Sequence, residues 1–393
     1  MKKKFFATIL TAALAISAFS GCGGSSQESA AAMATPSVEA DTKEAEDAAK
    51  TAEEEAASKA AEEEAARQEE ANTCYEQGRA CLYGLNGQEI DLEAAYSNFV
   101  NALKLGKTEA NFYLGILCDW YNYPEQDYEK ALAYYEAAGD DPYAQLALGY
   151  LYYNGHGVEK DRAKAQEMFD AVIAEGCVEG YLGSADVAAE DVEDFDTAFE
   201  YFNKALEGEE QIYIASASYD IGYMYRYGLG VEQDYAQAME WYEKSADLGY
   251  PAAMNVIGYM YDYGEGVEQD YTKAMEWYIK ASDLGNSNAM ANIAWMYENG
   301  NGVKQDYTKA LEWYTKAADL GSTVSMNNIG WLYENGYGVE QDYTKALEWY
   351  MKAADLGYTT SMRNIGYYYE NGLGVEKDSK KAQEWYDKAA AAE

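Results

Sequence analysis

Histidine and proline are almost absent from this chain of 393 residues, which has one histidine and four prolines. Because imidazole is the commonest metal ligand and general base in proteins, a lone histidine argues against a histidine-based catalytic or metal centre. His156 lies between Gly155 and Gly157, where the other copies of a repeat described below have unrelated residues. We predict a solvated loop position for it.

Cysteine is also scarce, with five residues at irregular spacing. Cys74 and Cys81 lie on one predicted helix with their Cα atoms about 10 Å apart, beyond the ~7 Å that a disulfide can bridge. We expect Cys74, Cys81, Cys118 and Cys177 to be buried thiols. A long-range bond such as Cys81 to Cys118 stays open, because the N-terminus described below predicts export to a compartment that is oxidising in many bacteria.

Basic residues are few. The chain has 29 Lys and Arg against 69 Asp and Glu, a formal net charge of −40. Nucleic acids and anionic lipid headgroups are bound by clustered cations that replace counterions. We therefore predict no nucleic-acid partner, and the charge favours cationic or neutral ones.

Long apolar runs are missing beyond the N-terminus. There, Lys2, Lys3 and Lys4 precede an apolar run at 5–18, too short for the ~20 residues that span a bilayer. The following Phe19-Ser20-Gly21-Cys22 resembles a bacterial lipoprotein processing box. The resemblance implies that residues 1–21 are a signal peptide, that Cys22 is lipidated, and that the protein is held in the cell envelope, outside the cytoplasm, with membrane contact by its anchor alone. An ordinary secretory signal is the alternative.

Residues 22–71 have a different composition, small and polar up to Pro36 and then rich in Ala and Glu. These residues favour helix but offer no large side chains to bury. We expect an acidic spacer in the form of a solvated helical rod or a disordered strand. A coiled-coil partner is an alternative, weakened by having only Ala for its seam.

A sequence motif of thirty-six residues occurs in five regular copies over 217–393, marked by Trp-Tyr pairs at 241, 277, 313, 349 and 385. Residues 72–216 contain degenerate copies, which brings the count to about nine. Each repeat has a small residue in its first half, and we number repeats 1 to 9 by these residues: Gly78, Gly115, Gly149, Gly183, Gly222, Gly258, Ala294, Gly330 and Gly366. Such periodicity is typical of stacked helical pairs, each of which needs neighbours to bury its apolar face.

Each repeat predicts two helices and a joint. In repeat 6, apolar residues at helical spacing predict a first helix over about 252–263. Gly264 and Gly266 end it, Val267 folds back on its end, and Asp270 is placed to cap a second helix. Gly258 lets the two helices approach closely. The predicted fold class is all-α, an α-solenoid of about nine helix pairs.

The motif from Ile257 to Gly285 resembles the Sel1-like repeat family, relatives of the tetratricopeptide repeats. The resemblance implies a right-handed α-solenoid that acts as an adaptor or scaffold and is not an enzyme. The carboxylates recur with the repeat, so the unit explains them, and we find no singular constellation for catalysis. We predict no cofactor and no metal.

The variable face of the first helices is the candidate binding site. Three places of each repeat share this face: three before, one after and four after the small residue. An aromatic ring occupies the central place in all of repeats 5–9, beside changing polar groups, a mixture that is typical of interface anchors. The predicted protein-binding residues are Tyr219, Tyr223, Arg226, Asn255, Tyr259, Asp262, Trp295, Glu298, Asn327, Trp331, Glu334, Arg363, Tyr367 and Glu370.

We predict a membrane-tethered extracytoplasmic scaffold whose concave groove, by the same resemblance, binds another exported protein or a peptide. The alternative function is a carbohydrate or cell-wall glycan binder, because rings beside carboxylates also suit sugars. The alternative for the rings themselves is that they pack against the neighbouring repeat. A hydrolase is the third reading.

Overall fold

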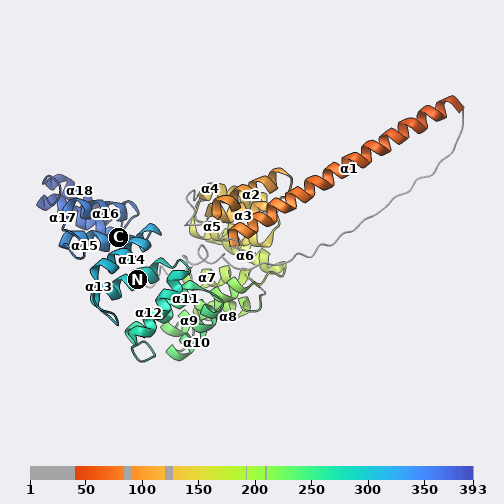
Figure 1. The fold of residues 1–393 in the computed structure, drawn as a ribbon. Coiled ribbons are helices and arrows are strands. Elements are labelled where there is room, and N and C mark those ends of the chain that lie inside the picture. Colours follow the sequence, from red (N-terminus) through yellow and green to blue (C-terminus); the bar gives the residue numbers. More distant parts are fainter. Residues whose placement is uncertain (1–39, 84–90, 120–126, 192, 209, 393) are drawn as a thin grey trace. The chain divides into compact units, whose positions relative to one another are not determined.

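The computed structural model describes residues 40–83, 91–119, 127–191, 193–208 and 210–392, which form eighteen helices and no strand (Figure 1). The predicted signal peptide and Cys22 lie outside these residues. The helices are α1 (Ala40–Tyr83), α2 (Leu92–Lys104), α3 (Ala110–Asp119), α4 (Tyr128–Ala137), α5 (Pro142–Asn154), α6 (Arg162–Ala174), α7 (Gly180–Asp191), α8 (Phe195–Ala205), α9 (Gln211–Tyr227), α10 (Tyr235–Asp247), α11 (Pro251–Tyr263), α12 (Tyr271–Asp283), α13 (Ser287–Asn299), α14 (Tyr307–Asp319), α15 (Thr323–Asn335), α16 (Tyr343–Asp355), α17 (Thr359–Asn371) and α18 (Ser379–Ala391). The all-α, repeat-built fold class is confirmed.

The described helices belong to two compact units, one ending at Glu190 and the other beginning at Asp191. The first contains three helical pairs and most of α7, and the second runs from α8 to α18. The division falls within repeat 4, earlier than the place near residue 217 where the sequence becomes regular.

The joint between paired helices forms as the residues predict. In repeat 6, Gly264 adopts a left-handed conformation with φ of 71°, and its N–H donates to the carbonyl of Met260. Asp270 then caps α12, because its carboxylate accepts hydrogen bonds from the N–H groups of Thr272 and Lys273 at 3.0 and 3.1 Å. These contacts satisfy backbone groups that the two helix ends would otherwise leave open.

A ring from the second helix fills the space beside the small residue of the first. A Cβ atom built on Gly258 would lie 2.6 Å from Cδ1 of Tyr278. Tyr278 is fully buried, as are its counterparts in the other regular repeats except the last. Glycine thus costs helix propensity but lets the ring pack against the backbone.

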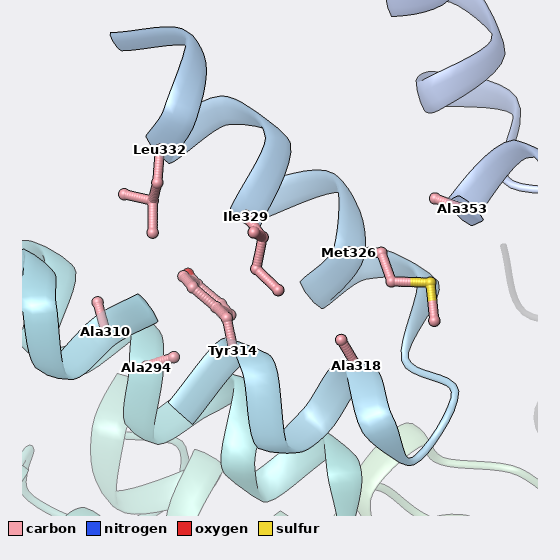
Figure 2. Close-up of a cluster of buried hydrophobic side chains, with 8 residues drawn as sticks. All are labelled: Ala294, Ala310, Tyr314, Ala318, Met326, Ile329, Leu332 and Ala353. Atoms are coloured by element: carbon pink, nitrogen blue, oxygen red, sulfur yellow. The ribbon is translucent and has the colours of Figure 1, made fainter. Parts of the chain in front are cut away.

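The apolar core continues from one repeat into the next. One cluster draws on four helices: Ala294 from α13, Ala310, Tyr314 and Ala318 from α14, Met326, Ile329 and Leu332 from α15, and Ala353 from α16 (Figure 2). Repeats 7 and 8 therefore share one buried cluster, which is the continuity that the periodicity predicts.

Repeat 4 departs from the pattern. A Cβ atom on its small residue, Gly183, would contact the ring of Phe169 from repeat 3, whereas the other mid-helix glycines of both units meet the ring of their own repeat. Its joint has no Gly-x-Gly, and Glu193 there adopts a positive φ of 52°. The chain divides into its two units at this repeat.

The acidic spacer, as far as the structure describes it, is helical. From Ala40 the helix α1 runs without a break to Tyr83, so it crosses the predicted spacer boundary at residue 71 and also supplies the first helix of repeat 1 (Figure 1). Residues 56–70 are exposed, and some of their side chains form i,i+3 or i,i+4 ion pairs on the helix surface, such as Lys59 with Glu63. No helix in the described ranges combines the length and apolar character that crossing a bilayer requires.

Candidate functional site

The predicted binding residues lie on α9, α11, α13, α15 and α17, and their exposure increases along the chain. In repeat 5, Tyr219 is only 3% exposed and Tyr223 is also buried. Tyr219 packs against the rings of Tyr242 and Tyr250, with both centroids 5.5 Å away. Trp331 and Tyr367, by contrast, are 37% and 50% exposed. Tyr219 and Tyr223 therefore fit the alternative that the sequence left open, packing within the array.

The acidic residues at the fourth place are bonded within their own repeats. Asp262, Glu298, Glu334 and Glu370 each accept a hydrogen bond from a tyrosine hydroxyl sixteen residues later, at 3.2, 2.8, 2.7 and 2.9 Å. The donors are Tyr278, Tyr314, Tyr350 and Tyr386. Each carboxylate thus satisfies the hydroxyl of a ring that packs beside the small residue.

Burial perturbs these carboxylates. It raises the pKa of Asp262 and of Glu298, although the tyrosine hydrogen bonds act in the opposite direction. Asp119 holds the same place in repeat 2, where burial raises its pKa to about 6 and the hydroxyl of Tyr135 again opposes the shift. None of these carboxylates needs a catalytic role to explain its shift.

A sequence signal for this pairing exists, although the predicted site was not based on it. Except in repeat 5, repeats whose second helix carries tyrosine have an acidic residue at the fourth place, whereas repeats with phenylalanine do not. Leu82 faces Phe99 in repeat 1, Val187 goes with Phe202 in repeat 4, and Tyr153 with Phe169 in repeat 3. A ring without a hydroxyl needs no acceptor.

Repeat 5 is the exception, with Arg226 at the fourth place. Arg226 is 7% exposed, and its guanidinium bonds to Glu265 of repeat 6, with Nε and Nη2 lying 2.8 and 2.7 Å from Oε2. It also lies over two rings, 5.2 Å from the centroid of Tyr227 and 4.8 Å from that of Tyr259. Arg226 thus links two repeats by charge and by cation–π contact.

Two predicted asparagines join neighbouring first helices. The side-chain oxygen of Asn255 accepts a hydrogen bond from Asn292 at 2.9 Å, and that of Asn327 accepts from Asn364 and Ser361, both at 2.9 Å. First helices of successive repeats are therefore in direct contact.

The remaining rings form a surface that we call the aromatic row: Tyr259, Tyr263, Trp295, Trp331, Tyr337 and Tyr367. Tyr263 stacks on Tyr259 at 4.3 Å and lies nearly parallel to Trp295 at 6.3 Å. Tyr337 lies 5.1 Å from Trp331 and also stacks on Tyr307. Tyr263 and Tyr337 are not among the predicted residues, because they lie five and seven residues after the small residue, outside the three predicted places. Arg363 is exposed on α17.

His156 is half-buried, not fully solvated as predicted, because its ring stacks on Tyr128 with centroids 4.3 Å apart. Burial lowers its pKa. Among the described residues, Cys74, Cys81, Cys118 and Cys177 are thiols and not disulfides; Cys118 is buried as predicted, whereas the other three are half-buried. The same part of the chain has no group of three or more His, Cys, Asp or Glu side chains arranged to hold a metal ion.

Comparison with known protein families identifies the repeat. The Sel1 repeat family matches residues 108–141, 142–171, 186–209, 215–250, 251–286, 287–322, 323–358 and 359–393, more than half of the chain. This protein belongs to the Sel1 repeat family. The match gives eight Sel1 repeats, and it leaves out repeat 1, although the structure gives that repeat the same helical pair and glycine-to-ring contact.

Several solved structures are similar to this Sel1 repeat protein. A Sel1 repeat protein from Oxalobacter formigenes is 32% identical, with a TM-score of 0.48 over 68% of this chain and 95% of that one. The protective antigen c5321 of uropathogenic Escherichia coli is 29% identical, with a TM-score of 0.40 over 82% and 78%. The immunity protein Pa5087 of Pseudomonas aeruginosa is 22% identical, with a TM-score of 0.38 over 50% and 74%. No curated protein matches the chain.

Proposed function

We propose that this Sel1 repeat protein is an adaptor that holds another exported polypeptide against its aromatic row. The proposal includes a lipid anchor at Cys22 that tethers the array to a membrane outside the cytoplasm. The family is one of scaffolds, and its members are generally not catalysts.

The observation that supports this function is the exposure of large rings on a face whose other predicted residues are engaged. The acids at the fourth place bond to tyrosines, and Asn255 and Asn327 link successive helices. Tyr263, Trp331 and Tyr367 remain 52%, 37% and 50% exposed. Large exposed rings held on rigid helices make good anchors for a partner, because little side-chain freedom is lost on binding.

Site-specific photo-crosslinking tests the proposal. A photoreactive phenylalanine analogue replaces Tyr367 in the full chain expressed in its own cells, and crosslinked products are identified by mass spectrometry. We expect a defined polypeptide that is lost when Trp331→Ala is added. The matched control places the analogue at Trp313, on the second helix α14, where Lys316 lies 3.9 Å from the ring centroid.

The outcomes separate the candidate functions. If the analogue labels the same polypeptide equally from positions 367 and 313, or if labelling persists with Trp331→Ala, the aromatic row is not the binding face. Retention of the protein on purified cell-wall glycan, abolished by the same substitution and without a polypeptide product, would support the glycan-binding function in its place.

A further inference from the structure

We infer that the aromatic row binds arginine side chains of an extended partner segment. About one arginine would bind at each seam, the contact between two successive repeats, from repeat 6 to repeat 9. This inference rests on the proposed function and names the chemistry of the partner. It starts from a site that the chain already occupies with its own arginine.

That site is the seam between repeats 5 and 6. Arg226 lies there over the rings of Tyr227 and Tyr259 and bonds to Glu265. Two rings and a carboxylate suit a guanidinium, which is planar, weakly hydrated and always charged. The seam thus shows which ligand this arrangement of side chains accommodates.

One repeat further on, the rings recur and the arginine does not. Thirty-six residues after Tyr227 and Tyr259 stand Tyr263 and Trp295, whose planes lie within 23° of parallel. The place of Arg226 is taken by Asp262, which accepts a hydrogen bond from Tyr278 and has no Lys or Arg partner among the described residues. Asp262 is itself buried, but the two rings recur here without a guanidinium at the place of Arg226, and Tyr263 is 52% exposed. We place a cation of the partner on these rings.

At the next two seams the sequence has a carboxylate at the position of Arg226 and a ring at the position of Tyr259. Glu298 precedes Trp331 at the seam of repeats 7 and 8, and Glu334 precedes Tyr367 at the seam of repeats 8 and 9. Both carboxylates use one oxygen to accept a tyrosine hydroxyl. With a formal charge of −40 on the whole chain, a cationic segment also gains long-range attraction.

The spacing of the seams sets the spacing of the arginines. The asparagine bonds put successive first helices in contact, and packed helices lie about 8–10 Å apart. An extended segment rises about 3.1–3.4 Å per residue, so every third side chain advances by about 9–10 Å. The partner segment is therefore expected to carry arginine at about every third position.

The test measures binding of a fluorescent synthetic peptide with arginine at every third position to the purified full chain. Two controls are a peptide of identical composition with its arginines clustered at one end and a peptide with lysine for every arginine. We expect the spaced arginine peptide to bind at least about fivefold more tightly than either control, since guanidinium stacks on rings better than ammonium.

Variants locate the site. Trp295→Ala and Trp331→Ala should each weaken binding about fivefold, which corresponds to the ~1 kcal/mol of one cation–π contact. Trp313→Ala on α14 should leave it unchanged, and melting curves recorded for each variant verify the fold. No binding, equal binding of all three peptides, or insensitivity to the row substitutions would overturn the inference. The photo-crosslinking at Tyr367 does not depend on arginine, so a defined product there together with no peptide binding would reject this inference alone.

Discussion

At the scale of single residues, the pairing between a fourth-place acid and a tyrosine is the feature that most changes the interpretation of the sequence. A carboxylate on a variable face suggests a ligand contact, yet Asp262 is buried and serves the hydroxyl of Tyr278. Its recurrence in repeats 6 to 9 follows from the chemistry of the ring. A buried hydroxyl without an acceptor loses the hydrogen bond that it makes to water in the unfolded chain.

A double-mutant cycle tests this pairing. Tyr278→Phe should lower the free energy of unfolding by about 1–3 kcal/mol, because it leaves the buried Asp262 without its donor. Adding Asp262→Leu gives the repeat the Leu and Phe of repeat 1, and should restore part of the loss, with a coupling of about 1 kcal/mol. Urea unfolding followed by circular dichroism measures both. Strictly additive effects would show that the two side chains do not act as a pair.

The raised pKa of Asp119 predicts a dependence of stability on pH. Its ordinary pKa of 3.8 rises to about 6 on burial, so the folded state holds the proton more tightly than the unfolded state. The stabilisation is complete below about pH 4 and is lost as the pH rises through about 6. Asp119→Asn should therefore raise the melting temperature at about pH 8 and change it little near pH 4. A uniform shift at all pH values would contradict this assignment.

At the scale of elements, the two glycines of each joint have different tasks. Gly264 and Gly266 both have φ of 71°, but only Gly266 sits against Tyr235, at the start of the second helix of the preceding repeat. The first glycine ends a helix, while the second permits close approach between repeats.

This difference predicts unequal effects of two substitutions. Gly264→Ala meets no atom closer than 3.4 Å and should cost only the ~1–2 kcal/mol of a left-handed alanine. Gly266→Ala has the same φ and adds the clash with Tyr235, so it should cost at least about 1 kcal/mol more. Hydrogen exchange of α10 and α11 localises the damage. Equal effects of the two substitutions would mean that the contact between Gly266 and Tyr235 can rearrange without loss of stability.

The elements were predictable because their signals are local. The joint glycines, the capping aspartates and the apolar spacing fix helix ends within one repeat, and α11 and α12 lie where repeat 6 predicts them. Which face of a first helix stays open was not predictable to the same degree. The burial of Tyr219 depends on Tyr250, and the engagement of Asn327 depends on Asn364, contacts that only the assembled repeats create. The partner of Gly183 was missed for the same reason.

At the scale of the whole molecule, stability should be close to a sum over repeats and their seams, because each repeat packs mainly on its neighbours. Deletion of residues 287–322 removes one Sel1 repeat, with α13 and α14. Gly338 would then meet Tyr271 in place of Tyr307, a tyrosine in either case. The new seam is expected to match the old one.

The shortened chain should therefore fold. We expect unchanged helix content per residue by circular dichroism, a monodisperse elution profile, and a melting temperature lowered by no more than a few degrees. Aggregation or loss of helix would show that repeat 7 supports the array in a way that its neighbours cannot replace.

Because the joint glycine of one unit fits the aromatic residue that opens the second helix of the unit before it, the same interlock recurs along the chain. Unequal recombination that inserts or removes thirty-six codons would then yield a working product at once. Lineages carrying this gene are therefore expected to differ more in the number of repeats than in the sequence of each repeat. A change in repeat number would alter the length of partner segment that the array binds and keep the contacts within each repeat the same.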